Sequence, residues 1–207
     1  MTKLLDDLSH MEGAAWKCIR MAHFFDLVSA HPSDDRFWIF VQNALGESAC
    51  LLWCHLFGSR SDPLHYTKLV AHAEVEALGT RFSPAAVKGR LLAHAGLNDA
   101  TFDALWEQVK RCRDKYIAHR QPDAEVEFPQ LDRCVLVAEA FRDLLADVVD
   151  ALRKQQPRDG ELLSLHRFYR EQTNATLKRS CEREFLAGLK SASTWAQAGV
   201  DAAHGAA

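Results

Sequence analysis

Apolar residues in this 207-residue chain recur at alternating spacings of three and four, and this periodicity restricts the chain to helices. The first segment shows it most clearly, because a stripe of small and apolar residues predicts one helix over 3–29. The stripe consists of Leu4, Leu8, Met11, Ala15, Cys18, Ala22 and Phe25. No segment of useful length alternates apolar and polar residues as a half-buried strand would. Only 10 Gly and 6 Pro interrupt the chain, which favours long helices.

Capping residues at the breaks in this pattern define the expected helix ends. Ser33, Ser83 and Asn98 are the expected N-caps. Gly96 is expected to end the helix that precedes Asn98. Together, periodicity and caps predict helices over 3–29, 34–57, 64–78, 84–95, 99–117, 130–155 and 161–190. We therefore predict an all-α fold, an antiparallel helical bundle forming a single domain. The domain is expected over 1–200, with a short helical insertion at about 64–95 and a flexible tail over 201–207.

Charge and cysteine usage exclude several classes of protein. The chain has 25 Lys and Arg against 28 Asp and Glu, a net charge of −3, so it is not a polycation that coats nucleic acid. Any contact with nucleic acid must come from a local basic patch. The six cysteines form no Cys-x-x-Cys pair, which predicts buried thiols in a reducing compartment. Without a signal peptide or an apolar run of about 18 residues, we expect a cytoplasmic protein with no membrane partner.

The basic patch is the segment KRCRDKYIAHR, residues 110–120, called here the basic segment. Its cations are Lys110, Arg111, Arg113, Lys115 and Arg120, and they accompany His119 and the single acid Asp114. One interpretation is an ordinary solvated helix face, which is what such runs usually form. The apolar residues Tyr116, Ile117 and Ala118 argue against it, because they predict that the segment is partly packed.

Helical geometry indicates what the basic segment could do. Arg113 and His119 would lie about 120° apart around a helix and about 9 Å apart along it. They can converge if the helix ends near Ala118, or if two copies meet across a two-fold axis. Histidine transfers protons near neutral pH, and arginine stabilises charge on a phosphate. This pair therefore suits metal-free cleavage of RNA by its own 2′-hydroxyl.

Two segments resemble the HEPN superfamily of small helical-bundle proteins, many of which are ribonucleases. The run from Arg113 through Asp114 to His119 is similar to its motif of an arginine, a polar residue and a later histidine. The stretch LLWCHLFGSRSDPLHYTKL, residues 51–69, is similar to the branch related to abortive-infection U-type (AbiU-like) proteins. The resemblance covers most of 1–155. It implies a homodimer with facing motif helices that cleaves RNA without metal or cofactor.

The resemblance also implies roles for single residues. His119 would be the general base or acid, Arg113 would contact the scissile phosphate, and Asp114 would orient one of them. The remaining site residues would bind RNA or phosphate: Lys110, Arg111, Lys115, Tyr116 and Arg120. Such a protein would act in phage defence or in a toxin–antitoxin system, the latter with an antitoxin partner. The alternatives are a non-catalytic HEPN-like module that binds nucleotide, RNA or a protein, and a purely structural protein.

Other motifs have ordinary explanations. Residues 87–113 could form a helix-turn-helix, but an acidic start to the second helix is unfavourable for DNA, and a simple helical hairpin is commoner. Cys50 and Cys54 share a helix face with His55 next to them, yet no second ligand pair completes a metal site, which favours core cysteines. No phosphate-binding glycine loop, Gly-x-Ser-x-Gly or His-Glu-x-x-His motif is present. Kinase, α/β-hydrolase and zinc-peptidase functions therefore have no support in the sequence.

Overall fold

The computed structural model describes residues 2–31, 36–114, 129–157 and 159–204, and every regular element within them is helical. The α-helices are α1 (Thr2–Ser29), α2 (Arg36–Phe57), α3 (Tyr66–Val70), α4 (Ala73–Glu76), α5 (Pro84–Ala95), α6 (Asp99–Arg111), α7 (Leu131–Gln155), α8 (Gly160–Glu171) and α9 (Asn174–His204). A short 3₁₀ helix, η1 (Thr80–Phe82), precedes α5. The predicted all-α fold is therefore confirmed. None of the described helices is both long enough and apolar enough to cross a bilayer.

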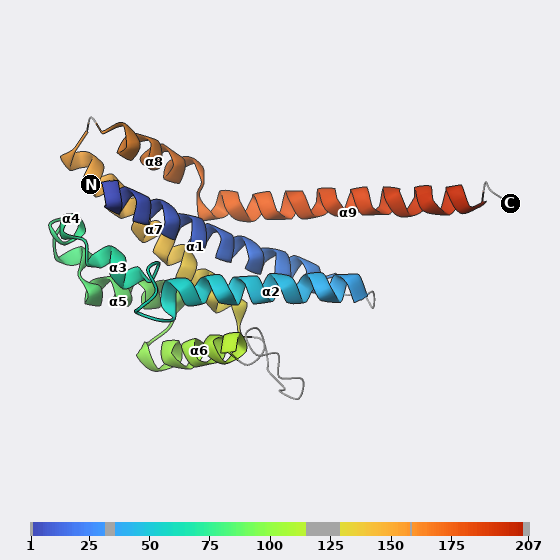
Figure 1. The fold of residues 1–207 in the computed structure, drawn as a ribbon, viewed down its shortest axis with the longest axis horizontal. Coiled ribbons are helices and arrows are strands. Elements are labelled where there is room, and N and C mark those ends of the chain that lie inside the picture. The colour runs from blue at the N-terminus through green and yellow to red at the C-terminus, as the bar shows by residue number, and fades with distance from the viewer. Residues whose placement is uncertain (1, 32–35, 115–128, 158, 205–207) are drawn as a thin grey trace.

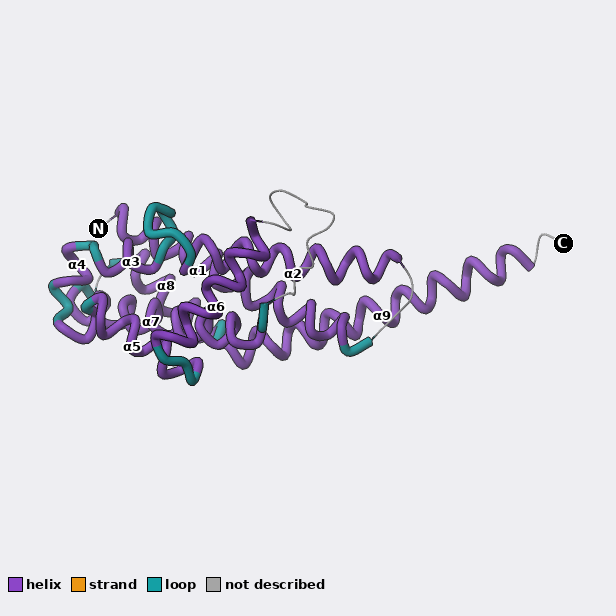
Figure 2. The backbone as a smooth tube through the Cα atoms, turned by 90° about the horizontal axis from the view of Figure 1, so that it is seen from below, coloured by secondary structure: helices purple, strands orange, loops and turns teal. Residues whose placement is uncertain are grey.

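The bundle is organised around α1, which packs on α2 along its length and on α7 (Figure 1). The short elements α3, α4 and η1 gather with α5 at one end, where α5 packs on α7. Helix α6 lies along one side of α2, and α8 covers α7. Helix α9 starts beside α1 and extends well past the other elements (Figures 1 and 2). It reaches His204, beyond the start of the tail expected at residue 201.

The predicted stripe on α1 forms the centre of the core. Leu8, Met11, Ala15 and Ala22 are completely buried there, because α2 and α7 cover this face from two sides. Burial of a large side chain such as Leu8 or Met11 stabilises the fold by about 1.5–3 kcal/mol. Phe25, the last residue of the stripe, packs on the edge of the core and is only partly buried.

Helix α2 differs from its prediction in its N-terminal half. Helical spacing places Phe37 on one stripe with Val41, Ala44, Ser48, Leu52 and Leu56, and so predicts that Phe37 points inward. Phe37 is instead 61% exposed, and Phe40 is 68% exposed. In the C-terminal half the side chains of Trp53 and Leu56 are completely buried, as a helix under α1, α6 and α7 requires. The prediction was wrong for Phe37 because α2 is apolar on more than one face, and periodicity alone does not indicate which face the bundle covers.

Two predicted helices are interrupted. The segment 64–78 forms α3 and α4 with a break at Ala71 and His72, and Gly79 then adopts a φ of 104° that favours glycine. The segment 161–190 forms α8 and the start of α9, with a break at Gln172 and Thr173. Neither break is marked by proline or glycine, so periodicity predicts continuous helices in both places.

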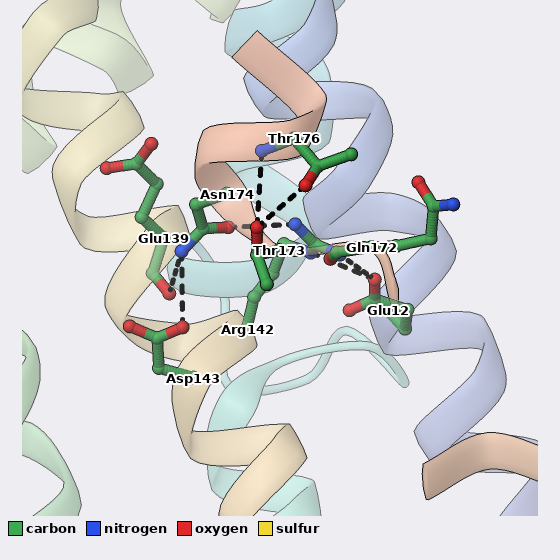
Figure 3. A network of polar contacts seen from close by, with 8 residues as sticks. All are labelled: Glu12, Glu139, Arg142, Asp143, Gln172, Thr173, Asn174 and Thr176. Atoms are coloured by element: carbon green, nitrogen blue, oxygen red, sulfur yellow. Dashed lines mark hydrogen bonds and ion pairs between the residues drawn. The ribbon is translucent and has the colours of Figure 1, made fainter. Parts of the chain in front are cut away.

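Contacts from a distant helix explain the second break (Figure 3). The buried Arg142 guanidinium of α7 donates to the backbone oxygen of Gln172 at 2.9 Å and to Asn174 Oδ1 at 2.8 Å. It also forms an ion pair with Glu12 of α1, with Nη2 2.6 Å from Oε1. Glu12 and Arg142 are only 4% and 3% exposed, and burial raises the pKa of Glu12. One buried arginine thus joins α1, α7 and the α8–α9 corner.

The predicted caps near the short helices are confirmed. Ser83 Oγ accepts a hydrogen bond from the Ala86 backbone N–H, and Pro84 occupies the first turn of α5. Gly96 ends α5 with a φ of 64°. The Asn98 side chain accepts from the Thr101 N–H at 2.9 Å and starts α6. The expected cap at Ser33 lies outside the described residues.

Candidate functional site

A cleft of about 710 Å³ opens between α6 and the segment that follows α2, and we call it the Arg113 cleft. It is lined both by Lys110 and Arg113, from the described part of the basic segment, and by several residues of the stretch 51–69. The lining residues are Phe57, Gly58, Ser59, Arg60, His65, Tyr66, Lys88, Phe102, Asp103, Trp106, Glu107, Lys110 and Arg113.

Helix α6 supplies one wall of the cleft through residues at helical spacing. Trp106, Lys110 and Arg113 are separated by four and three positions, so they lie on one face. The Lys110 ammonium is 4.7 Å from the centre of the Trp106 ring, a cation–π contact. Val109, which lies next to this face around the helix, is completely buried in the core. The core therefore holds α6 with its polar and cationic face toward the cleft.

The opposite wall is the turn after α2, which is fixed to α6. Trp106 Nε1 donates a hydrogen bond of 2.9 Å to the Gly58 backbone oxygen. Position 58 has no room for a side chain, because a Cβ there would lie 2.5 Å from the Cys54 backbone oxygen. Glycine thus lets the chain turn closely against the end of α2, and the turn carries Arg60 to the rim.

More cationic than acidic residues line the cleft. Four cationic residues line it, at 60, 88, 110 and 113, against two acids, Asp103 and Glu107. Two of these cations are paired with acids outside the lining, Lys88 with Asp99 at 2.5 Å and Arg113 with Asp114 at 2.6 Å. The arginines at 60 and 113 and the ammonium of Lys110 remain as donors for an anion, with the rings of Tyr66 and Trp106 beside them.

Arg113 is oriented by its neighbour in the chain. Asp114 Oδ1 accepts from Arg113 Nε at 2.7 Å and lies 2.6 Å from Nη2. Residues 112–114 form a π-helical turn at the end of α6, a local widening that is common at functional sites. Asp114 occupies one edge of the guanidinium, which also contacts the Cys54 side chain, and its remaining N–H groups are available to a ligand. Burial raises the pKa of the nearby Cys54 thiol to about 11, although the charge of Arg113 opposes this.

His65 closes the inner end of the cleft as a neutral, structural residue. Its side chain is 3% exposed and caps α3, because Nδ1 accepts from the Thr67 N–H at 3.3 Å. Burial lowers the pKa of His65 to about 4, and the charge of Arg60 adds to the effect. At neutral pH the imidazole is uncharged, so His65 positions the wall and does not supply a charge to a ligand.

The structure brings together part of the predicted site. Arg113 and Lys110 line the cleft, and Asp114 pairs with Arg113, as one of its two expected roles requires. Arg111 is exposed and is not a lining residue. The other predicted site residues lie outside the described residues: Lys115, Tyr116, His119 and Arg120. The distance between Arg113 and His119 therefore stays a prediction.

Sequence reasoning missed several lining residues. The spacing of Trp106 from Lys110 and Arg113 was the available signal, because separations of four and three place all three on one face of a continuous helix. Arg60 carried no local signal, since its place in the cleft depends on how the turn after α2 packs against α6. Lys88 reaches the cleft from α5, and its position likewise depends on tertiary packing.

The metal-binding alternative receives no support in the described part of the chain, where no group of three or more His, Cys, Asp or Glu side chains is placed to hold an ion. Cys50 and Cys54 are buried and unpaired, as expected for core cysteines. His55 Nδ1 contacts Asp62 at 2.7 Å, and His72 Nε2 contacts Asp7 at 2.9 Å.

A second cleft, between α1, α7 and α9, has the opposite charge. Its volume is about 380 Å³, and it is lined by four acids, one lysine and one histidine among apolar residues. The acids are Asp26, Asp132, Glu139 and Glu182. Burial raises the pKa of both Asp26 and Glu139, which reflects poor compensation of their charge. An anionic ligand would be repelled here, so the Arg113 cleft is the better candidate.

Comparisons of the chain with family models, curated proteins and solved structures find no match. Its function is therefore inferred from the cleft itself.

Proposed function

We propose that this chain is a HEPN-like, metal-independent endoribonuclease that binds RNA in the Arg113 cleft. The observation that carries the proposal is the position of the Arg113 guanidinium in this cleft. Arg113 is held by Asp114 at a cleft that is lined by four cationic and two acidic residues and by the partly buried rings of Tyr66 and Trp106. Phosphate binding to arginine and base stacking on Tyr66 or Trp106 are the two contacts that single-stranded RNA offers.

The proposed reaction uses Arg113, Asp114 and His119. The proton of the RNA 2′-hydroxyl passes to a base, the 2′-oxygen attacks phosphorus, and the bond to the 5′-oxygen breaks as that oxygen is protonated. His119 is the proposed base or acid. Arg113 stabilises the charge that develops on the phosphate, and Asp114 keeps its guanidinium in place. The products carry a 2′,3′-cyclic phosphate and a 5′-hydroxyl, and the active unit is a homodimer with facing motif helices.

The test is cleavage of single-stranded RNA by the full chain in the presence of a chelator. Arg113→Ala is expected to lower the rate about 100-fold or more, the usual effect of losing one transition-state donor. His119→Ala is expected to lower it about 100- to 10,000-fold. Arg167→Ala, which removes an exposed arginine of α8 outside the cleft, is the matched control and should leave the rate unchanged. Equal cleavage by all four proteins would contradict the mechanism.

The second candidate is a non-catalytic module that binds RNA or nucleotide in the same cleft. It is favoured by the Lys110–Trp106 contact, because a cation beside a partly exposed aromatic ring suits binding of a nucleotide without requiring a proton-transfer group. Binding of labelled RNA without product after long incubation would favour this candidate over the nuclease. Loss of that binding in Arg113→Ala would still place the ligand in the cleft.

A further inference from the structure

Two acids line the Arg113 cleft beside its cations, although a negative charge repels the phosphates of RNA. They are Asp103 and Glu107, both on α6 and both exposed. Asp103 lies close enough to Lys88 for its charge to act on that ammonium. Within the described parts of the chain, the Glu107 carboxylate has no partner in a hydrogen bond or ion pair. Both of its oxygens are therefore available as acceptors for a ligand.

Glu107 lies between the aromatic ring and the cations of the α6 wall. It directly follows Trp106, whose ring lines the cleft. Lys110 comes three positions after Glu107 and three positions before Arg113, so it lies between them on the helix surface. Glu107 and Arg113 are about 9 Å apart along the helix and about 120° apart around it. A ring, a carboxylate and two cations thus follow one another along this wall.

This order of groups matches the parts of a single nucleotide. Lys110 and Arg113 suit the phosphate, because both are cations that donate hydrogen bonds. Trp106 suits the base, since single-stranded RNA is commonly bound by stacking of its bases on aromatic rings. The carboxylate of Glu107 is the neighbour of that ring and suits the hydrogen-bonding edge of the stacked base.

A carboxylate distinguishes the four RNA bases by their hydrogen-bonding edges. It only accepts hydrogen bonds, and its two oxygens bind best to two adjacent donors. Guanine has two adjacent donors on its Watson–Crick edge, the N1–H and the N2 amino group. Adenine and cytosine carry a ring nitrogen acceptor beside their amino group, and uracil carries a carbonyl oxygen on each side of its N–H. Those acceptors repel a carboxylate, so guanine is the base that it favours.

We propose that Glu107 recognises guanine, so that the Arg113 cleft selects a guanosine of single-stranded RNA. This inference rests on the proposed function, because it requires RNA to occupy the cleft. The two oxygens of Glu107 accept from the N1–H and the N2 amino group, and the base stacks on Trp106. The 3′-phosphate of the same guanosine lies at Arg113. In the proposed reaction, the 2′,3′-cyclic phosphate is then left on guanosine.

The charge of Glu107 also acts against other ligands and orientations. It repels a phosphate placed beside it, which directs the phosphate toward Arg113 and the base toward Glu107. A base without paired donors would leave the carboxylate without the hydrogen bonds that it has in water, and this lowers the affinity for that base. Glu107 therefore reduces the affinity for RNA in general and contributes specificity.

The test is binding of short RNAs by the full chain, measured by fluorescence anisotropy. The probes are 2′-O-methyl oligouridylates with one central guanosine, adenosine, cytidine or uridine, which lack the attacking hydroxyl and so are not cleaved. We expect the guanosine probe to bind about 5- to 150-fold more tightly than each of the others, the discrimination that one bidentate contact provides. Equal affinity for all four probes, or a preference for another base, would overturn the proposal.

Glu107→Gln assigns the preference to this side chain, because glutamine presents one acceptor and one donor instead of two acceptors. The variant should lose the preference for guanosine and still bind the other probes, whereas Glu171→Gln, at an exposed acid of α8 outside the cleft, should keep it. A preference that survives in Glu107→Gln would contradict the assignment. If all four probes bind equally and Arg113→Ala abolishes their binding, only guanine recognition fails. If no probe binds, the proposed function fails with it.

Discussion

Trp106 Nε1 donates a hydrogen bond of 2.9 Å to the backbone oxygen of Gly58, a residue 48 positions earlier in the chain. This contact joins the cationic face of α6 to the turn after α2 and so creates the Arg113 cleft. Residues 110–113 and the stretch 57–66 are therefore neighbours in space. Each wall of the cleft depends on the other for its position.

Gly58→Ala should disturb this junction. The new Cβ would lie 2.5 Å from the Cys54 backbone oxygen, so the turn must shift, and we expect a loss of about 1–3 kcal/mol in the free energy of unfolding. The matched control is Gly89→Ala at an exposed position of α5, where the Cβ meets no atom within 4 Å. That substitution should stabilise by about 0.5–1 kcal/mol through helix propensity. Equal effects in urea denaturation would contradict the close approach at residue 58.

His65 should make the protein less stable in mild acid. Burial lowers its pKa to about 4 in the folded state, whereas the unfolded histidine titrates near 6.5. Below about pH 6.5 the unfolded chain gains a proton that the folded chain does not, so stability falls until the pH reaches about 4. The loss attributable to His65 is about 2 kcal/mol between pH 7 and pH 5.

His65→Asn isolates this contribution, because asparagine can still cap α3 but does not titrate. The difference in free energy of unfolding between pH 7 and pH 5 should be smaller in the variant by about that amount. An unchanged pH dependence would show that the histidine is not held neutral by burial.

The buried ion pair of Glu12 and Arg142 should be costly to break from one side. Arg142→Met leaves the Glu12 carboxylate buried without its partner, and we expect a loss of about 3–5 kcal/mol. Adding Glu12→Leu removes the orphaned charge and should recover a large part of that loss. Purely additive effects in this double-mutant cycle, measured by urea denaturation, would contradict the coupling.

RNA binding should depend on salt through the cations of the cleft. Arg60→Ala and Lys110→Ala should each weaken binding and reduce the slope of log K against log salt by about 0.7, the value for one lost phosphate contact on a single strand. Arg167→Ala on α8 should change neither quantity, because this residue lies outside the cleft. Fluorescence anisotropy at several salt concentrations measures both, and equal slopes in all three variants would place the RNA elsewhere.

Local signals in the sequence predicted much of the fold. The apolar stripe of α1, the Ser83 and Asn98 caps and the Gly96 stop each depend on residues within a few positions of one another. The break at Gln172 could not be predicted in this way, because Arg142 of α7 causes it from 30 positions away. Phe37 was misplaced for a related reason, since the choice between two apolar faces is made by neighbouring helices.

In the candidate site, too, residues with a local sequence signal were predicted and residues placed by tertiary contacts were missed. Arg113, Asp114 and Lys110 were found because they are consecutive or nearly so within one basic run. Arg60 was missed because the packing of Trp106 on Gly58 brings it to the rim. Residue type and local spacing identify groups that can act on a phosphate, whereas the cleft that they share is a product of tertiary contacts.

The most direct test of the proposed RNA site is to map ultraviolet cross-links between the full chain and a single-stranded RNA by mass spectrometry. The Arg113 cleft predicts cross-links on the peptides that carry Tyr66 and Trp106, and their loss in Arg113→Ala but not in Arg167→Ala. Cross-links confined to α1, α7 or α9 around the acidic cleft, or an unchanged pattern in Arg113→Ala, would contradict it.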